Sequence, residues 1–94
     1  MGMIVLDLQF RFEKVFKIRI PRRWLAEIGI REAGDDATLA DIQQYLLRLC
    51  QNQNVVPPQD SWKILVTVVA EATGIKLKDL TPETQLVRDI APFG

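Results

Sequence analysis

Residues 62–94 read WKILVTVVAEATGIKLKDLTPETQLVRDIAPFG, and this stretch decides the fold. Its first part predicts an amphipathic helix that Asp60 or Ser61 caps and that ends at Gly74, a usual residue after a helix C-terminus. Thr81-Pro82-Glu83 can add one helical turn. The side chains expected to point inward are Ile64, Leu65, Val68, Val69 and Ala72 in the helix, and Ile75, Leu77, Leu80, Leu86, Val87 and Ile90 after it.

The composition is typical of a small globular domain and excludes several classes of protein. The chain has 94 residues, of which 48% are hydrophobic and 26% charged, so we expect a single domain over residues 1–94. It has one cysteine, and no apolar run approaches the roughly 20 residues that a membrane span needs. We therefore expect a cytoplasmic protein with no disulfide and no membrane partner.

The charge is balanced overall but unevenly distributed. Residues 1–31 carry seven basic and three acidic side chains, a net charge of +4, and residues 32–94 carry five and nine, a net charge of −4. Because the total is zero, we do not expect nucleic-acid binding. The chain has no histidine, and it shows neither a nucleophile–base pair nor metal-ligand spacing. We therefore do not expect an enzyme.

Residues 3–16 allow two secondary structures. Alternating apolar residues between positions 4 and 12 favour a strand, whereas Ile4, Leu8, Phe12 and Phe16 at steps of four favour a helix. Local evidence leaves both open and favours the helix slightly. Pro21 then disfavours helix at the residue before it and can start a short helix over about residues 22–27.

The next helix is the clearest in the chain. Thr38-Leu39-Ala40-Asp41 resembles a capping box, and a helix is predicted from there to about Gln51. Leu39, Ile42, Leu46 and Leu49 form its apolar face, with Tyr45 at the flank. Residues 52–60 are a linker, because the pair Pro57-Pro58 cannot continue a helix.

Two sets of residues resemble the acyl carrier protein family. Residues 61–94 resemble its first half, in which an apolar helix ends at Gly-Ile, a Thr-Pro-Glu turn follows, and a hydrophobic-x-x-Asp-hydrophobic run precedes an Asp-Ser-Leu motif. Residues 3–51 resemble its second half, in which Phe-x-Ile-x-Ile-Pro precedes a helix that starts Thr-hydrophobic-small-Asp. The matching residues are Gly74-Ile75, Thr81-Pro82-Glu83, Leu86 to Ile90, Phe16 to Pro21, Thr38 to Asp41 and Tyr45.

The two halves stand in reversed order. The resemblance therefore implies an all-α fold, an acyl-carrier-protein-like four-helix bundle with three main helices and one short helix, circularly permuted. On this basis residues 3–16 are a helix. Two alternatives stay open: the chain could straddle two tandem carrier domains, or two copies could exchange halves as a swapped dimer. We expect a monomer or such a half-swapped dimer.

The family's function rests on one serine, which carries 4′-phosphopantetheine at the start of the second helix. Alignment from Pro21 puts Gly2 at that position, and alignment from Asp89 puts Gly94 there; neither residue has a hydroxyl group. Ser61 is the only serine in the chain, and we interpret it as a helix cap. We therefore expect no bound cofactor in this chain, because the attachment serine is missing.

The resemblance also implies protein partners. The family's second helix is usually acidic and docks on basic patches of partner enzymes, whereas here Arg11, Lys14 and Lys17 reverse that character. The candidate partner-facing residues are Arg11, Lys14, Arg22 and Arg23. The implied function is a carrier-like domain related to acyl or peptidyl carriage in fatty-acid or polyketide-type metabolism. The alternative is a protein-interaction module on the same fold that carries nothing.

Three other features have both a functional and a purely structural interpretation. The bases from Arg11 to Arg23 with the aromatic residues among them could bind nucleic acid, but their spacing favours core aromatics and a solvated basic face. Asp35-Asp36 could hold a metal ion, but in a Gly turn we expect turn residues. Cys50 is expected to be a partly buried small apolar residue. The aromatic residues assigned to the core are Phe10, Phe12, Phe16 and Trp24.

Overall fold

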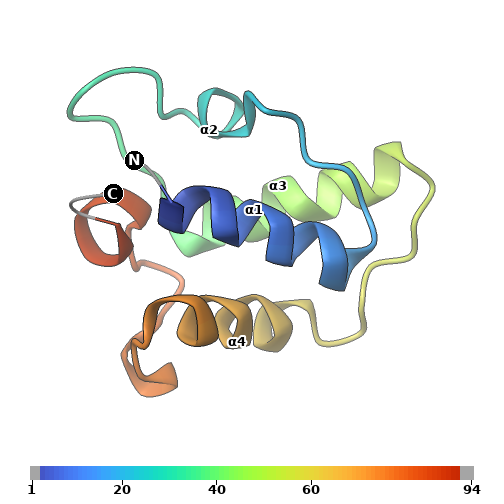
Figure 1. The fold of residues 1–94 in the computed structure, drawn as a ribbon. Helices are drawn as coiled ribbons and strands as arrows, with labels where there is room; N and C mark the ends of the chain where they lie inside the picture. The colour runs from blue at the N-terminus through green and yellow to red at the C-terminus, as the bar shows by residue number, and fades with distance from the viewer. Residues whose placement is uncertain (1–2, 92–94) are drawn as a thin grey trace.

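Four α-helices and two short helical turns make up residues 3–91, the part of the chain that the computed structural model describes (Figure 1). The helices are α1 (Met3–Phe16), α2 (Trp24–Glu27), α3 (Leu39–Asn52) and α4 (Ser61–Thr73). The turns are η1 (Leu77–Asp79) and η2 (Leu86–Ile90), the latter of π type. The described residues contain no β-strand, so the predicted all-α class is confirmed.

Helix α1 resolves the ambiguity of residues 3–16. Its buried side chains follow a helical period: Val5, Leu8, Phe12 and Phe16. A strand would have put Phe10 and Phe12 on one face, whereas a helix turns them about 200° apart because each residue advances about 100°. The helix ends at Phe16, and the next residue, Lys17, has a φ of +58°, which lies in the left-handed region. There the Ile18 N–H donates to the Glu13 carbonyl oxygen at 3.2 Å.

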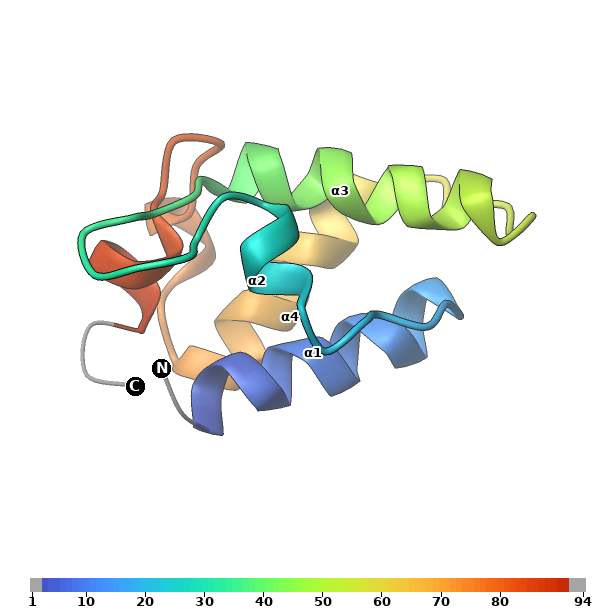
Figure 2. The same ribbon diagram turned by 90° about the horizontal axis from the view of Figure 1, so that it is seen from above.

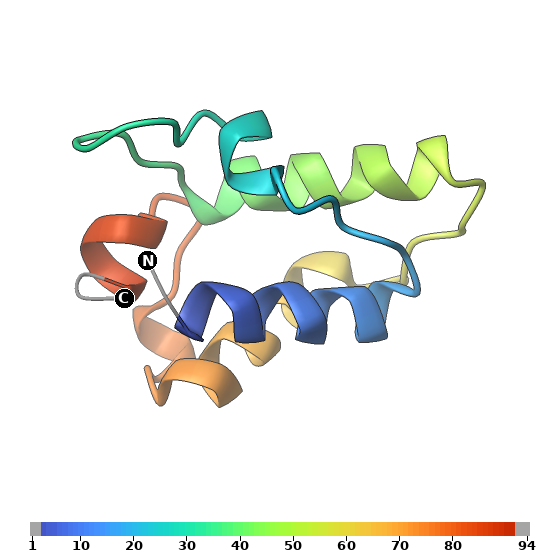
Figure 3. The same cartoon turned by 45° about the horizontal axis from the view of Figure 1, so that its top comes forward.

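Helix α1 packs mainly on α4, and α3 also contacts α4. Figures 1 and 3 show α1 and α4 side by side, with α3 completing the bundle. The many β-branched residues of α4 give it a low intrinsic helix propensity. Burial of its inner face against α1 and α3 therefore has to stabilise it. Its buried residues are Leu65, Val66, Val68 and Val69. Ile64 and Ala72, which the sequence placed in the buried stripe, are only half-buried.

The predicted start of α3 and the predicted end of α4 are both confirmed. At the start of α3 the Asp41 N–H donates to Thr38 Oγ1 at 3.1 Å, and the Thr38 N–H donates to the Asp41 carboxylate at 3.0 Å. Helix α4 ends at Gly74 with a φ of +79°. Leu39, Ile42, Tyr45, Leu46 and Cys50 are buried on α3. Tyr45 was expected only at the flank, and Leu49, expected in the apolar face, is half-buried.

The segment between α1 and α2 is extended and is held by side chains on both sides. The Ile20 N–H donates to the Glu13 carboxylate at 2.7 Å, and Gln9 Nε2 donates to the Ile20 carbonyl oxygen at 3.2 Å. On the other side, the Gln53 amide group accepts from the Arg19 N–H at 2.9 Å and donates to the Arg19 carbonyl oxygen at 2.7 Å. These contacts satisfy backbone groups that no helix satisfies.

The loop before α3 is joined to the last part of the described chain. The Leu39 N–H donates to the Thr84 carbonyl oxygen at 2.9 Å, and the Leu86 N–H donates to the Ala37 carbonyl oxygen at 2.8 Å. The Asp36 carboxylate accepts hydrogen bonds from the Val87 N–H at 2.7 Å and the Arg88 N–H at 3.0 Å. We call these last two bonds the Asp36 clasp. In Figure 2 this loop and η2 lie at the same end of the bundle.

The prediction for residues after Gly74 was only partly right. Leu80, Leu86 and Ile90 are buried as expected, but Leu77 is 54% exposed. Thr81-Pro82-Glu83 forms no helical turn. Instead, the Thr81 N–H donates to Thr84 Oγ1 at 2.9 Å in a non-helical turn, and the helical turns fall on η1 and η2. The buried residues of all the elements belong to one core.

Candidate functional site

The position expected to carry the prosthetic group lies outside the described residues, because Gly2 and Gly94 both fall there. Within residues 3–91, the hydroxyl group to consider is that of Ser61. It is half-buried in the first turn of α4, and its Oγ accepts a hydrogen bond from Gln43 Nε2 at 3.1 Å. Asp60 occupies the cap position but its side chain makes no capping hydrogen bond. The prediction that a side chain of Asp60 or Ser61 caps α4 is therefore wrong. The Ser61 side chain instead links α4 to α3 through its hydrogen bond with Gln43.

The structure separates the four residues predicted to face a partner into two groups. Arg11 and Lys14 lie on α1 and line a shallow groove against α4. Arg22 and Arg23 are exposed in the turn before α2, where Arg23 lines a different hollow. Arg11 is also partly engaged, because its Nε donates to the Asp7 carboxylate at 3.1 Å. The four predicted residues therefore do not form one common surface: Lys14, Arg22 and Arg23 are exposed in two separate places, and Arg11 is half-buried.

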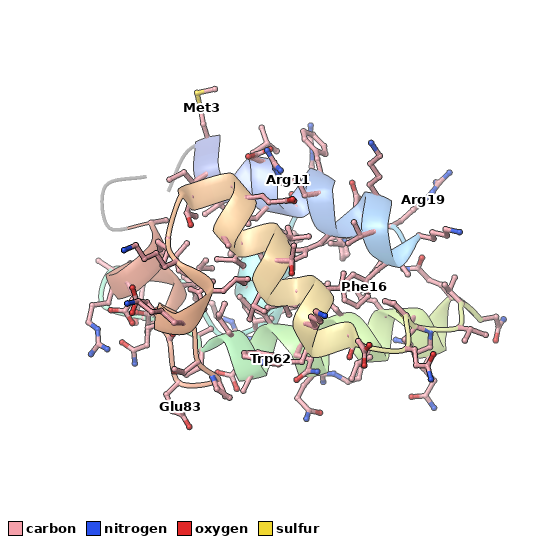
Figure 4. The ribbon with its side chains drawn as sticks, turned by 90° about the horizontal axis from the view of Figure 1, so that it is seen from below. Met3, Arg11, Phe16, Arg19, Trp62 and Glu83 are labelled. Atoms are coloured by element: carbon pink, nitrogen blue, oxygen red, sulfur yellow. The ribbon has the colours of Figure 1, made fainter. Side chains whose placement is uncertain are left out.

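The feature that sequence reasoning missed is an apolar row on the solvent side of α1. Met3 is 85% exposed, Leu6 49% and Phe10 57%. Their spacing of three and then four residues puts them on one helix face, opposite the buried Val5, Leu8 and Phe12. Figure 4 shows Met3 pointing away from the bundle at the start of α1. The assignment of Phe10 to the core was therefore wrong.

One lysine continues the same face and a second follows the helix. Lys14 lies four residues after Phe10 in the last turn of α1, Lys17 is the first residue after the helix, and both are exposed. Within residues 3–91 neither forms an ion pair with a carboxylate, whereas Arg11 pairs with Asp7. We call Met3, Leu6, Phe10, Lys14 and Lys17 the α1 outer face. A purely structural role for Lys14 is a favourable interaction with the helix dipole. That role does not explain the exposed apolar row.

Two buried titratable groups, Tyr45 and Cys50, belong to the core. The Tyr45 hydroxyl donates to the Glu27 carboxylate, and burial together with this bond raises the pKa of Tyr45 well above its ordinary value. Burial also raises the pKa of the Cys50 thiol, which is fully buried rather than partly buried as expected. A thiol in such surroundings is a poor nucleophile.

Asp35 closes a turn, as the sequence predicted, whereas Asp36 lies after that turn and contacts a distant segment. The Asp35 carboxylate accepts hydrogen bonds from the Arg31 N–H at 3.0 Å and the Glu32 N–H at 3.1 Å, which lowers the pKa of that carboxyl group. The Asp36 carboxylate forms the Asp36 clasp. Among the described residues, no group of three or more His, Cys, Asp and Glu side chains could hold a metal ion.

No helix within residues 3–91 is both long and apolar enough to cross a membrane. The site that the geometry offers is therefore the α1 outer face, a partly apolar and partly basic surface whose residues Met3, Leu6 and Phe10 line an open hollow. Comparisons of this chain with protein-family models, with curated proteins and with solved structures gave no match.

Proposed function

We propose that this chain is a carrier-protein-like domain, circularly permuted, that acts by docking on a protein through the α1 outer face and does not itself carry phosphopantetheine. The observation that carries the proposal is the exposed row Met3, Leu6 and Phe10. Proteins rarely leave neighbouring large apolar side chains in water on one face, and such patches mark interaction sites.

The order and lengths of the helices support the carrier-like part of the proposal. We take the elements in the order α4, η1, η2, α1, α2 and α3, as the usual connection would have them. A long helix is then followed by a loop with two short turns, a second long helix, a short helix and a third long helix. The acyl carrier protein resemblance implies four helices in this same order, of which the third is short and the other three are long. The start of α1 and the turn η2 lie at the same end of the bundle in Figures 1, 2 and 3. That proximity supports a permuted order, because a direct connection there would restore the usual one.

The resemblance implies 4′-phosphopantetheine as cofactor, but the described residues do not fit its attachment. Attachment needs an accessible serine hydroxyl at the start of the helix that corresponds to α1. The serine present, Ser61, lies at the start of α4, is half-buried and is hydrogen-bonded to Gln43. The two residues aligned with the attachment site, Gly2 and Gly94, have no hydroxyl group.

A mass measurement tests the cofactor part of the proposal. The chain is incubated with coenzyme A and a phosphopantetheinyl transferase, with a known carrier protein as positive control. The expected result is full modification of the control and no mass gain of this chain. A gain by one phosphopantetheine would overturn the proposal and make the chain a carrier.

Site-specific crosslinking tests the docking part. A photoreactive amino acid replaces Phe10 on the α1 outer face, and in a matched control it replaces Gln44, an exposed residue of α3. In cells that make the protein, we expect a discrete protein adduct from position 10 that is absent from position 44. Equal adducts from both positions, or none from position 10, would contradict docking through this face.

A mass measurement in solution tests the alternative of exchanged halves. Light scattering at high protein concentration should give the mass of one chain, because the pairing of α1 with α4 is already made within one copy. A stable dimer would instead favour the half-swapped arrangement.

A further inference from the structure

The α1 outer face changes character along its length. Met3, Leu6 and Phe10 occupy its first two turns, Lys14 lies in its last turn, and Lys17 follows directly after the helix. At about 1.5 Å per residue, the apolar part is about 10 Å long and Lys14 lies about 6 Å beyond it. A complementary surface therefore has to be apolar in one part and negatively charged one helical turn further along.

The positive charges on this face are available to a partner. Within residues 3–91 no carboxylate pairs with Lys14, Lys17 or the neighbouring Arg19, all of which are exposed. Figure 4 shows Arg19 directed away from the bundle, beyond the end of α1. Two acidic side chains line the groove beside Lys14: Asp7 pairs with Arg11 at 3.1 Å, and Glu71 of α4 forms no ion pair within residues 3–91.

We infer that the occupant of the α1 outer face is an acidic amphipathic helix of a protein partner; this inference rests on the docking function proposed above. Apolar side chains of that helix, spaced three and four residues apart, cover Met3, Leu6 and Phe10. Carboxylates one or two turns further along it pair with Lys14 and Lys17. Apolar contact supplies the affinity, and the charges fix the direction in which the helix lies.

Other occupants fit the surface less well. Nucleic acid can stack a base on Phe10 but offers nothing to cover the aliphatic Met3 and Leu6, and the chain has no net positive charge. A second copy of the chain does not complement the face either. Another large apolar side chain exposed on the described surface, Leu77, stands between Lys76 and Lys78. The outer face of a second copy carries lysines and no carboxylate that could pair with Lys14.

A selection experiment identifies the preferred charge without assuming a partner. A displayed library of helical peptides about 18 residues long carries apolar residues at helical spacing and an equal mixture of Glu and Lys elsewhere. Binders to the wild-type chain are collected after removal of those that also bind Phe10→Ser. The expected result is a clear excess of Glu over Lys in the selected peptides.

Affinity measurements on the selected peptides then test the two parts of the face. We expect Phe10→Ser to weaken binding about tenfold or more, and Lys14→Glu with Lys17→Glu to weaken it by a similar factor. The matched control, Lys76→Glu with Lys78→Glu, makes the same charge change in and just before η1 and should alter the affinity less than about twofold. Peptides with every Glu changed to Lys should regain binding to the Lys14→Glu, Lys17→Glu variant.

The outcomes separate this inference from the proposed function. Peptides that depend on Phe10 but are neutral or basic would overturn the acidic partner and leave docking through this face intact. A failure to select any peptide that depends on Phe10 would contradict both. Binding of single-stranded oligonucleotides or of phosphatidylserine vesicles that Phe10→Ser abolishes would replace the acidic helix by those ligands. Circular dichroism of each variant confirms that the fold is retained.

Discussion

The Asp36 clasp allows a quantitative prediction for Asp36→Ala. The substitution removes the acceptor for the Val87 and Arg88 N–H groups, and also for the Ala37 N–H at 2.8 Å. A carboxylate that receives several backbone N–H groups resembles a helix cap, whose loss costs about 0.5–2 kcal/mol. Because these bonds join segments 51 and 52 residues apart, we expect a value at the upper end, about 2 kcal/mol.

Two measurements check the loss of the Asp36 clasp. Urea unfolding followed by fluorescence of Trp24 and Trp62 gives the free energy of unfolding, and a loss of about 2 kcal/mol corresponds to a fall in Tm of about 10 °C for a chain of this size. Hydrogen exchange should become faster at the amides of Val87 and Arg88, because both lose their acceptor.

The neighbouring residue supplies the matched control for this prediction. Among residues 3–91, the Asp35 carboxylate accepts hydrogen bonds only from Arg31 and Glu32, within its own loop. Asp35→Ala should therefore leave exchange at Val87 and Arg88 unchanged and cost less stability. If Asp36→Ala changes the free energy of unfolding by less than about 0.5 kcal/mol, the level of an ordinary surface substitution, and leaves both amides protected, the clasp does not stabilise the fold.

Three further predictions concern single side chains. Phe12→Ala should lower the free energy of unfolding by about 3–5 kcal/mol, because Phe12 is fully buried. Phe10→Ala should lower it by less than about 0.5 kcal/mol, because Phe10 is 57% exposed. Equal losses of stability in urea unfolding would refute the assignment of these two residues to opposite faces of α1. Tyr45 has a raised pKa, so the folded state keeps its proton while the unfolded state loses it near pH 10, and stability should fall as the pH rises above about 10. A spectrophotometric titration in which tyrosinate forms at the ordinary pKa while the protein stays folded would contradict this. The thiol of Cys50 is fully buried, so a thiol reagent should label it only as fast as the protein opens, and immediate labelling of the native protein would show that the site is accessible.

The sequence was sufficient where a signal is local. The capping box of Thr38 and Asp41 and the stop at Gly74 depend on residues within one turn, and both ends were predicted correctly. Periodicity predicted three of the buried residues of α3 correctly (Leu39, Ile42 and Leu46). It missed the burial of Tyr45 and Cys50 and wrongly included the half-buried Leu49. Local signals of this kind report backbone preferences that the rest of the fold does not override.

The sequence was insufficient where the partner residue is distant. Nothing near Asp36 indicates that its carboxylate meets the backbone of Val87, so it could be recognised only as a turn residue. Phe10 was assigned to the core because an aromatic residue is usually buried, and its exposure depends on which face of α1 meets α4. That same dependence concealed the candidate site, since the exposed row becomes visible only once the buried face is known.

The pairing of α1 with α4 also affects how the protein folds as it is synthesised. The first helix, Met3–Phe16, leaves the ribosome several seconds before Ser61–Thr73 at a rate of about 5–20 residues per second. During that interval Leu8 and Phe12 lack their final neighbours, and Phe10 on the other face is exposed as well. The nascent helix is then apolar on two opposite sides, so that it can be bound by a chaperone before the bundle closes.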